Sequence, residues 1–150
     1  MSQSYCSLLY HFVFSTKHRE AIITPEIQEH LYGYLAGALK GEKCAPILIG
    51  GMPDHVHILT GLHQDCAPSA VLRSIKANSS KWLHRDFSAY RAFAWQAGYG
   101  GFTVSASQCD AVYRYIKRQE SHHKVMTFQE EFIGMLKKHK IEYDERYIWD

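Results

Sequence analysis

Apolar and polar residues alternate near the start of the chain. Between residues 5 and 14, alternate positions are apolar and would share one face, which is the period-two pattern of a β-strand. Two further short runs rich in apolar and β-branched residues, 47–49 and 55–60, are separated by turn-forming residues at 50–54. These runs predict two adjacent antiparallel strands joined as a hairpin.

Four other segments carry apolar residues at helical spacing. They are residues 25–41, 68–83, 107–119 and 128–135. All four have residues that suit a helix start. These are Thr24 with Pro25 for the first helix, Pro68 for the second, Ser107 with Asp110 for the third, and Thr127 with Glu130 for the last.

The segment between the second and third predicted helices is rich in aromatic residues and glycine. Residues 93–105 hold two aromatic-rich runs on either side of the glycines at 98–101, which predicts a strand, a turn and another strand. No internal repeat or linker interrupts the chain. The order of elements therefore predicts an α+β fold with an antiparallel β-sheet covered by helices, formed as one domain over residues 1–150.

Composition and charge add limits to this picture. A chain of 150 residues can bury one core without staples, and its four cysteines form no CxxC pair, so we expect no disulfide framework and a cytoplasmic location. No apolar run approaches the roughly 18 residues needed to span a bilayer. The net charge of +2 is too small to indicate a nucleic-acid partner.

The distribution of basic residues is more informative than their sum. Basic side chains cluster at 17–19, along the second predicted helix and at 114–118. Each cluster by itself is most often a solvated face. As candidates for phosphate contacts we select Lys17, Arg19, Arg73 and Lys76.

Two histidines lie in the run at 55–60. Because side chains alternate along a strand, His55 and His57 would point to one face with Cα atoms about 7 Å apart, and Val56 to the other. Neutral imidazoles bind transition metals, and a site that adds an amide or phosphate oxygen suits a hard divalent ion such as Mg²⁺ or Mn²⁺. Such a pair also occurs in other metal sites and in ordinary cores.

The helix predicted after Ser107 offers a further ligand and a nucleophile. Tyr115 and Gln119 are four residues apart and would be neighbours on one helix face. If Gln119 joins the histidines at a metal, the phenol of Tyr115 lies one turn away and can reach a phosphate bound to the same ion. Tyr113 is a rival nucleophile and Glu120 a rival ligand.

Three more histidines are candidates for the same region. His11 lies on the less apolar face of the first strand, where a structural role is commoner than one in a DNA cleft. His122 and His123 follow Gln119, but adjacent helical residues point about 100° apart and cannot both aim at one ion. We therefore expect this pair to close the helix.

Several sequence blocks, taken together and in this order, resemble the single-tyrosine HUH transposases, a family that includes insertion-sequence-200-like and REP-associated tyrosine transposases. The blocks are YHFVF at 10–14 followed by Lys17 and Arg19, MPDHVHIL at 52–59, WQAGY at 95–99 leading to FTVS at 102–105, and YIKRQ at 115–119. The resemblance covers nearly the whole chain.

This resemblance implies a ferredoxin-like or RRM-like HUH endonuclease core. It implies that His55, His57 and Gln119 hold Mg²⁺ or Mn²⁺, and that Tyr115 forms a 5′-phosphotyrosine link with single-stranded DNA that bears hairpin ends. It also implies a homodimer, in which the tyrosine helix can complete the active site of the other subunit.

Two other classes of function stay open at this point. A metal-dependent phosphodiesterase would use the histidine pair with activated water, although Leu59 stands where a third alternating histidine would lie. A DNA-binding module with a degenerate site is the other class. Within the transposase family that the chain resembles, a host-domesticated nuclease is also open. Only the transposase interpretation predicts a covalent protein–DNA adduct that depends on Tyr115.

Overall fold

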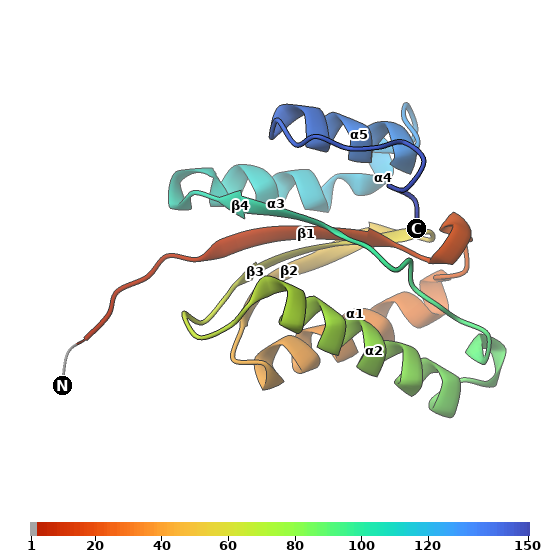
Figure 1. The fold of residues 1–150 in the computed structure, drawn as a ribbon. Helices are drawn as coiled ribbons and strands as arrows, with labels where there is room; N and C mark the ends of the chain where they lie inside the picture. Colours follow the sequence, from red (N-terminus) through yellow and green to blue (C-terminus); the bar gives the residue numbers. More distant parts are fainter. Residues whose placement is uncertain (1–2) are drawn as a thin grey trace.

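The chain folds around a four-stranded antiparallel sheet. The computed structural model describes residues 3–150, except for the side chain of His122. The strands are β1 (Leu9–Ser15), β2 (Ala45–Met52), β3 (His55–Gly61) and β4 (Gly100–Val104), in the spatial order β2-β3-β1-β4. Neighbouring strands all run antiparallel (Figure 1). The predicted α+β class is confirmed.

One side of the sheet, which we call the lower face, is covered by two long helices. These are α1 (Pro25–Gly41) and α2 (Pro68–Asp86), which lie below the sheet in Figure 1. Alternate residues of the central strands, Phe12 and Phe14 from β1 and Val56 and Ile58 from β3, pack with these helices in the main apolar core. The period-two and period-3.6 patterns of the sequence thus meet in one layer.

The other side, which we call the upper face, is covered by three shorter helices. They are α3 (Cys109–Lys117), α4 (Gln119–His122) and α5 (Phe128–Lys138) (Figure 1). The predicted capping box begins α5, because the Thr127 hydroxyl accepts from the Glu130 amide while the Glu130 carboxylate accepts from the Thr127 amide. Short 3₁₀ turns lie at Lys17–Arg19, Ser88–Tyr90 and Ala106–Gln108.

The strand boundaries differ from the sequence expectation in two places. β1 begins at Leu9 and not at residue 5, because its partner strands end opposite Leu9, at Gly61 and Val104. β2 continues through Met52, so the hairpin turn is confined to residues 53–54 and the glycines before it lie within the strand.

The prediction of two strands within residues 93–105 is wrong. Only β4 is a full strand, and the first run contributes one bridge between Thr16 and Trp95. Both runs pair antiparallel with the same edge of β1, one after the other along it. Gly98 therefore lies in a short interruption of one extended segment, Gly100 and Gly101 belong to β4, and the chain does not reverse.

The predicted helix over 107–119 is also interrupted. It begins at Cys109 without a side-chain cap, and the expected cap residue Ser107 lies in the preceding 3₁₀ turn. The helix ends at Lys117, and Arg118, with a φ of −99° and a ψ of 20°, separates α3 from α4. Tyr115 and Gln119 thus belong to two helical segments and not to one.

The cysteines, the helix lengths and the tail complete the description of the fold. All four cysteines are free. Among the described residues, no helix is both long and apolar enough to cross a bilayer. The tail folds back on its own chain, since Tyr143 and Trp149 pack against the apolar cluster under α5 and the Asp150 carbonyl accepts from the Gly98 amide.

Candidate metal centre

The centre of the upper face is built on two histidines of β3. Strand alternation points His55 and His57 toward α3–α5 while Val56 enters the lower core, as the sequence predicts. Both imidazoles are fully buried. The partner of His57 in β2 is Gly50, and a Cβ there would lie 2.7 Å from Ile116 Cγ2, so the glycine lets α3 approach the sheet closely.

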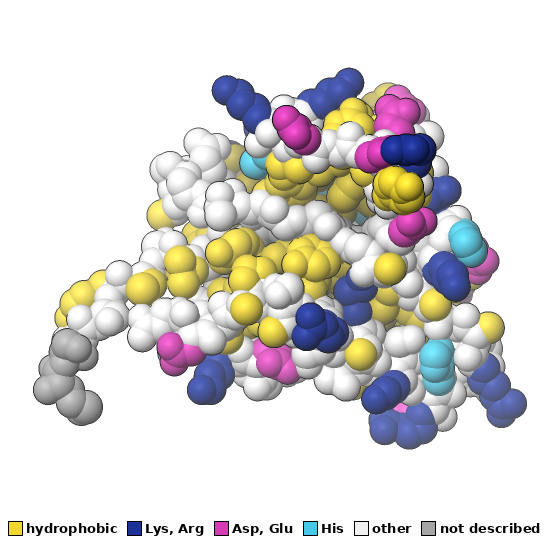
Figure 2. Space-filling view, viewed as in Figure 1, with side chains coloured by type: hydrophobic (Ala, Val, Ile, Leu, Met, Phe, Trp, Pro, Cys, Tyr) yellow, Lys and Arg dark blue, Asp and Glu magenta, His cyan; other side chains and the backbone are white. Residues whose placement is uncertain are grey.

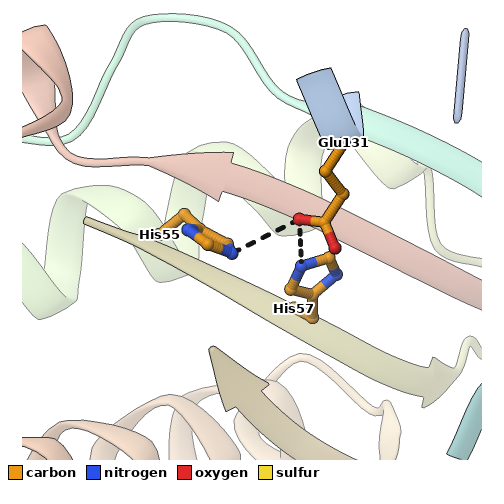
Figure 3. A group of neighbouring side chains, drawn as sticks. All are labelled: His55, His57 and Glu131. Atoms are coloured by element: carbon orange, nitrogen blue, oxygen red, sulfur yellow. Dashed lines mark hydrogen bonds and ion pairs between the residues drawn. The ribbon is translucent and has the colours of Figure 1, made fainter. Parts of the chain in front are cut away.

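Glu131 of α5 completes a buried group of three donor side chains (Figure 3). Its Oε1 lies 3.1 Å from His57 Nε2 and 3.4 Å from His55 Nε2. Glu131 is one turn beyond Phe128 and adjacent to Phe132, which places its carboxylate on the buried stripe of the helix. The sequence analysis missed this residue, because an acidic residue beside apolar positions is usually solvated.

Gln119 and Tyr115 reach the same carboxylate from α4 and α3. The Gln119 side-chain amide donates to Glu131 Oε2 over 2.9 Å, which turns its Oε1 toward His55 Nε2 at 2.9 Å. The Tyr115 hydroxyl donates to the same Oε2. The structure thus brings His55, His57, Gln119 and Tyr115 together despite the break at Arg118.

Each histidine of the pair has an outer partner on its other ring nitrogen. His55 Nδ1 donates to Asp54 Oδ1 over 2.6 Å, and His57 Nδ1 contacts His11 Nε2 at 2.8 Å. Outer partners of this kind fix the ring orientation of metal-bound histidines. His11 is buried and acts in this structural position, in line with the sequence expectation.

A third imidazole arrives from the segment between α4 and α5. His123 Nε2 lies 3.1 Å from Glu131 Oε1 and 3.2 Å from Gln119 Oε1. Its Nδ1 donates to the Met126 carbonyl over 2.9 Å. As expected, His123 closes a helix: it is the C-cap of α4, and its backbone amide donates to the Gln119 carbonyl over 3.0 Å. Its side chain also turns inward, which the sequence did not indicate.

Burial and mutual contacts perturb the titration of the group. Burial raises the pKa of Tyr115, and its contact with the Glu131 carboxylate raises it further. Burial alone would raise the pKa of Glu131, but hydrogen bonds to His55 and His57 outweigh it and hold that pKa well below its usual range. Burial lowers the pKa of His55, yet its bonds to Asp54 and Glu131 prevail and raise it to about 9. The carboxylate is therefore charged and the phenol protonated at neutral pH.

The donor set fits a divalent cation. Imidazole nitrogens, an amide oxygen and a carboxylate oxygen converge, and their separations of 2.9 Å to 3.4 Å match ligands that share one ion. Bonds of about 2.1 Å at angles between about 90° and 109° put neighbouring ligands roughly 3.0–3.4 Å apart. When His55 carries a second proton it donates to Gln119, and a bound cation would take the place of that proton.

The rival residues lie elsewhere. Glu120 is exposed, and Tyr113 packs in the apolar cluster between α3 and the sheet with the Lys117 ammonium 5.7 Å from its ring centre. Neither residue belongs to the group around Glu131, of which Figure 3 draws Glu131, His55 and His57.

The four candidate phosphate contacts lie on other elements, the 3₁₀ turn Lys17–Arg19 and α2. Arg73 and Lys76 line a hollow of about 490 Å³ between α2 and residues 94–99, where the Lys76 ammonium donates to the carbonyls of Ala97 and Gly98. Figure 2 shows apolar side chains between α2 and β4 with Lys and Arg side chains around them. Lys17 is exposed beside this region, and the Arg19 guanidinium lies 5.3 Å from the Trp149 ring centre.

Comparison with known sequences gives one family over most of the chain. The sequence model of the IS200-like transposases matches residues 4–119. The ISDra2 transposase TnpA of Deinococcus radiodurans R1 is 26% identical over 120 residues, which cover 75% of this chain and 84% of that protein.

Solved structures share the fold at lower identity. A crystal structure of a Deinococcus radiodurans R1 chain assigned as a transposase superposes with a TM-score of 0.63 at 22% identity, covering 79% of this chain and 96% of the other. A REP-associated tyrosine transposase bound to a REP hairpin superposes with a TM-score of 0.62 at 14% identity, covering 82% and 73%. Both similarities confirm the α+β architecture.

Proposed function

Because this chain belongs to the family of IS200-like transposases, we propose that it cuts and rejoins single-stranded DNA with Tyr115 as the nucleophile. The cation would be Mg²⁺ or Mn²⁺, held by His55, His57 and Gln119. One observation carries the proposal: the Tyr115 hydroxyl and the imidazole pair meet on the same buried carboxylate, Glu131. A nucleophile and a cation site so linked can act on one phosphate.

In the proposed step, the phenol oxygen of Tyr115 forms a bond to phosphorus and the bond to the 3′-oxygen breaks. The phenol gives up its proton, and the leaving oxygen takes one up. The product is a 5′-phosphotyrosine ester, which a second 3′-hydroxyl can attack in the reverse sense. The phosphotyrosine ester stores the energy of the broken bond, so strand transfer needs no nucleoside triphosphate.

Glu131 has two roles in this scheme: its Oε1 faces the cation site as a further donor, and its Oε2 positions the Tyr115 hydroxyl. Its lowered pKa keeps the carboxylate charged and makes it a weak proton acceptor, and a charged carboxylate accepts a strong hydrogen bond, so it orients the Tyr115 hydroxyl beside His57. When bound, the divalent cation supplies charge that polarises a phosphate oxygen. Asp54 and His11 keep the two imidazoles in the orientation that such binding requires.

The DNA is proposed to be a single strand with a hairpin end, because a structural relative is bound to a REP hairpin. Phosphate contacts are assigned to Lys17, Arg19, Arg73 and Lys76. Replacing one of these cations should weaken binding across sequences and lower the slope of log K against log salt by about one. An unchanged slope after all four are replaced contradicts the assignment.

The homodimer expected from the resemblance also stays a prediction. Tyr115 and His57 of one chain contact the same Glu131 carboxylate, so a monomer with this arrangement would hold the proposed nucleophile and ligands together. Light scattering on the free protein and on its DNA complex measures the assembly. A monomeric mass in both states contradicts the dimer and leaves the proposed cleavage step unaffected.

The decisive experiment is a search for covalent adducts on denaturing gels. Labelled single strands from the flanks of the gene are incubated with the protein and Mg²⁺ or Mn²⁺. We expect an adduct that disappears in Tyr115→Phe and in His57→Ala. Tyr113→Phe is the matched control, since this phenol lies on the same helix outside the cluster, and it should retain the adduct.

The other outcomes separate the competing functions. Cleavage without an adduct, retained in Tyr115→Phe, would establish a phosphodiesterase that uses water. Tight binding of single strands without cleavage would favour a DNA-binding module. An adduct that survives in Tyr115→Phe and is lost in Tyr113→Phe would move the nucleophile by two residues.

A further inference from the structure

The segment that joins α4 to α5 brings an imidazole to the metal centre that the histidine pair and Gln119 do not include. We infer that His123 is a further ligand of the cation, so that three imidazoles and not two hold it. This inference rests on the cation of the proposed function. The added ligand comes from the segment after α4, whereas His55 and His57 come from strand β3.

The hydrogen bonds of His123 determine what its inner nitrogen presents. A carbonyl oxygen only accepts, so the contact of Nδ1 with the Met126 carbonyl places a proton on Nδ1. A neutral imidazole in this tautomer carries a lone pair on Nε2. That lone pair faces Gln119 Oε1 and Glu131 Oε1, which are acceptors as well. With the ring neutral, no hydrogen lies between these atoms, and converging acceptors of this kind can form the coordination shell of a cation.

The position of Gln119 strengthens this argument. Its amide nitrogen donates to Glu131 Oε2, so the oxygen of the side chain is the atom that points inward. This oxygen lies 2.9 Å from His55 Nε2 and 3.2 Å from His123 Nε2. The Nε2 atoms of His123 and His55 therefore lie at similar distances from the two oxygens of the centre, Gln119 Oε1 and Glu131 Oε1.

Two distances place the Nε2 atom of His123 beside the oxygen donors of the centre, Glu131 Oε1 and Gln119 Oε1. This Nε2 is 3.1 Å from Glu131 Oε1, the same distance as that of His57 Nε2. Outer partners bond to the ring nitrogen that faces away from an ion, as Asp54 does with His55. The Nε2 of His123 instead faces the donors themselves.

Solvent access also distinguishes His123 from the other donors. A hollow of about 470 Å³ is lined by Met52, by Asp54 and by residues 123–130, so His123 forms part of its wall. His55 and His57 are fully buried, whereas the side chain of His123 is 9% exposed. His123 is therefore the imidazole of the three that is in contact with both the hollow and the buried donors.

A third imidazole changes which cations the centre favours. Imidazole nitrogen suits Co²⁺, Ni²⁺ and Zn²⁺, whereas Mg²⁺ prefers a shell of oxygen ligands. The inference therefore predicts that loss of His123 weakens Co²⁺ binding more than Mg²⁺ binding. This selectivity is a property of the ligand atom and would not follow from a purely structural contact.

The test is titration of metal alone into the full chain, followed by calorimetry and by the visible absorption of Co²⁺. His123→Asn is the key variant, because the Asn amide nitrogen can replace Nδ1 as the donor to the Met126 carbonyl while the Nε2 atom is deleted. His63→Asn is the matched control at an exposed histidine outside the cluster. Thermal unfolding of each metal-free variant verifies that it folds.

We expect His123→Asn to bind Co²⁺ at least about 100-fold more weakly, since loss of an outer partner already costs about 10- to 100-fold. The Co²⁺ spectrum should change, and His63→Asn should match the parent. Equal Co²⁺ affinity and spectra in His123→Asn and the parent would overturn the inference while leaving a Tyr115 adduct untouched. Failure of the parent to bind Co²⁺ would overturn the inference together with the cation of the proposed function.

Discussion

The two faces of one sheet are stabilised in opposite ways. On the lower face, apolar side chains of β1 and β3 pack against α1 and α2 in a continuous core. On the upper face, the same two strands present His11, His55 and His57, which are buried against polar side chains from three short helices. The lower face needs only apolar area, whereas each polar group of the upper face needs a partner.

This difference shows where the chain places its chemistry. Burial of polar groups costs free energy unless every one is bonded, so a cluster of this size is weak support for the fold. Helices α1 and α2 are long and regular, while α3 ends after Lys117 and α4 has four residues. The lower face holds the sheet in place and allows the upper face to be built for a site.

The largest expected effect comes from the lower face. Phe12 is fully buried at the centre of that core, so Phe12→Ala should lower the free energy of unfolding by about 3–5 kcal/mol. Chemical denaturation measures this change, with Tyr5→Ala as control at a side chain that is 87% exposed. A loss below about 1 kcal/mol would show that the lower core is not the main source of stability.

The next effect belongs to the upper face alone. A cation at about 100 times its dissociation constant should raise the free energy of unfolding by about 2.7 kcal/mol, because it binds only the folded chain. His57→Ala should abolish this rise, and Phe12→Ala should retain it. Thermal unfolding with and without Mn²⁺ measures both. Loss of the rise in Phe12→Ala would show that the two faces do not behave independently.

A smaller effect is expected where the upper helices meet the sheet. Gly50→Ala would place a Cβ 2.7 Å from Ile116 Cγ2 and 3.2 Å from the Ile116 carbonyl oxygen, so α3 must shift. We expect a loss of about 1–3 kcal/mol and a slower formation of the Tyr115 adduct. Gly61→Ala is the matched strand control, since its new Cβ has no neighbour closer than 3.7 Å. Unchanged adduct formation in Gly50→Ala would mean that the position of α3 does not limit the reaction.

The smallest effect concerns a charge on α2. Burial lowers the pKa of Lys76 from 10.5 to about 8. Between these values the unfolded chain holds a proton that the folded chain has lost, so the Lys76 contribution to the free energy of unfolding rises with pH. The difference between the parent and Lys76→Met should therefore increase from about pH 7 to about pH 10 in denaturation curves. A constant difference would place the ammonium in solvent.

The same contrast decides how much the sequence could predict. Alternation in β1 and β3 and the helical spacing from Pro25 to Gly41 predict the lower face, because a residue buried for its apolar area marks itself in the pattern. The upper face has fewer such marks. His55, His57, Gln119 and Tyr115 were found from their spacing and from the family resemblance, and the structure brings them together.

The residues that sequence reasoning missed are those joined only by tertiary contacts. Glu131 follows two polar residues at the start of α5, and only its position one turn beyond Phe128 indicates burial. His123 could not be placed because the end of α4 depends on the break at Arg118, which no proline or glycine marks. The arrangement of residues 93–105 along one edge of β1 likewise depends on pairing with a distant strand.

The shared carboxylate of Glu131 has a thermodynamic consequence. One oxygen faces the imidazoles and the other accepts from Tyr115, so occupancy of the cation site and the state of the tyrosine are not independent. Linkage requires the influence to be reciprocal. If a bound cation makes release of the Tyr115 hydroxyl from Glu131 more favourable by some factor, release of the hydroxyl raises the affinity for the cation by the same factor.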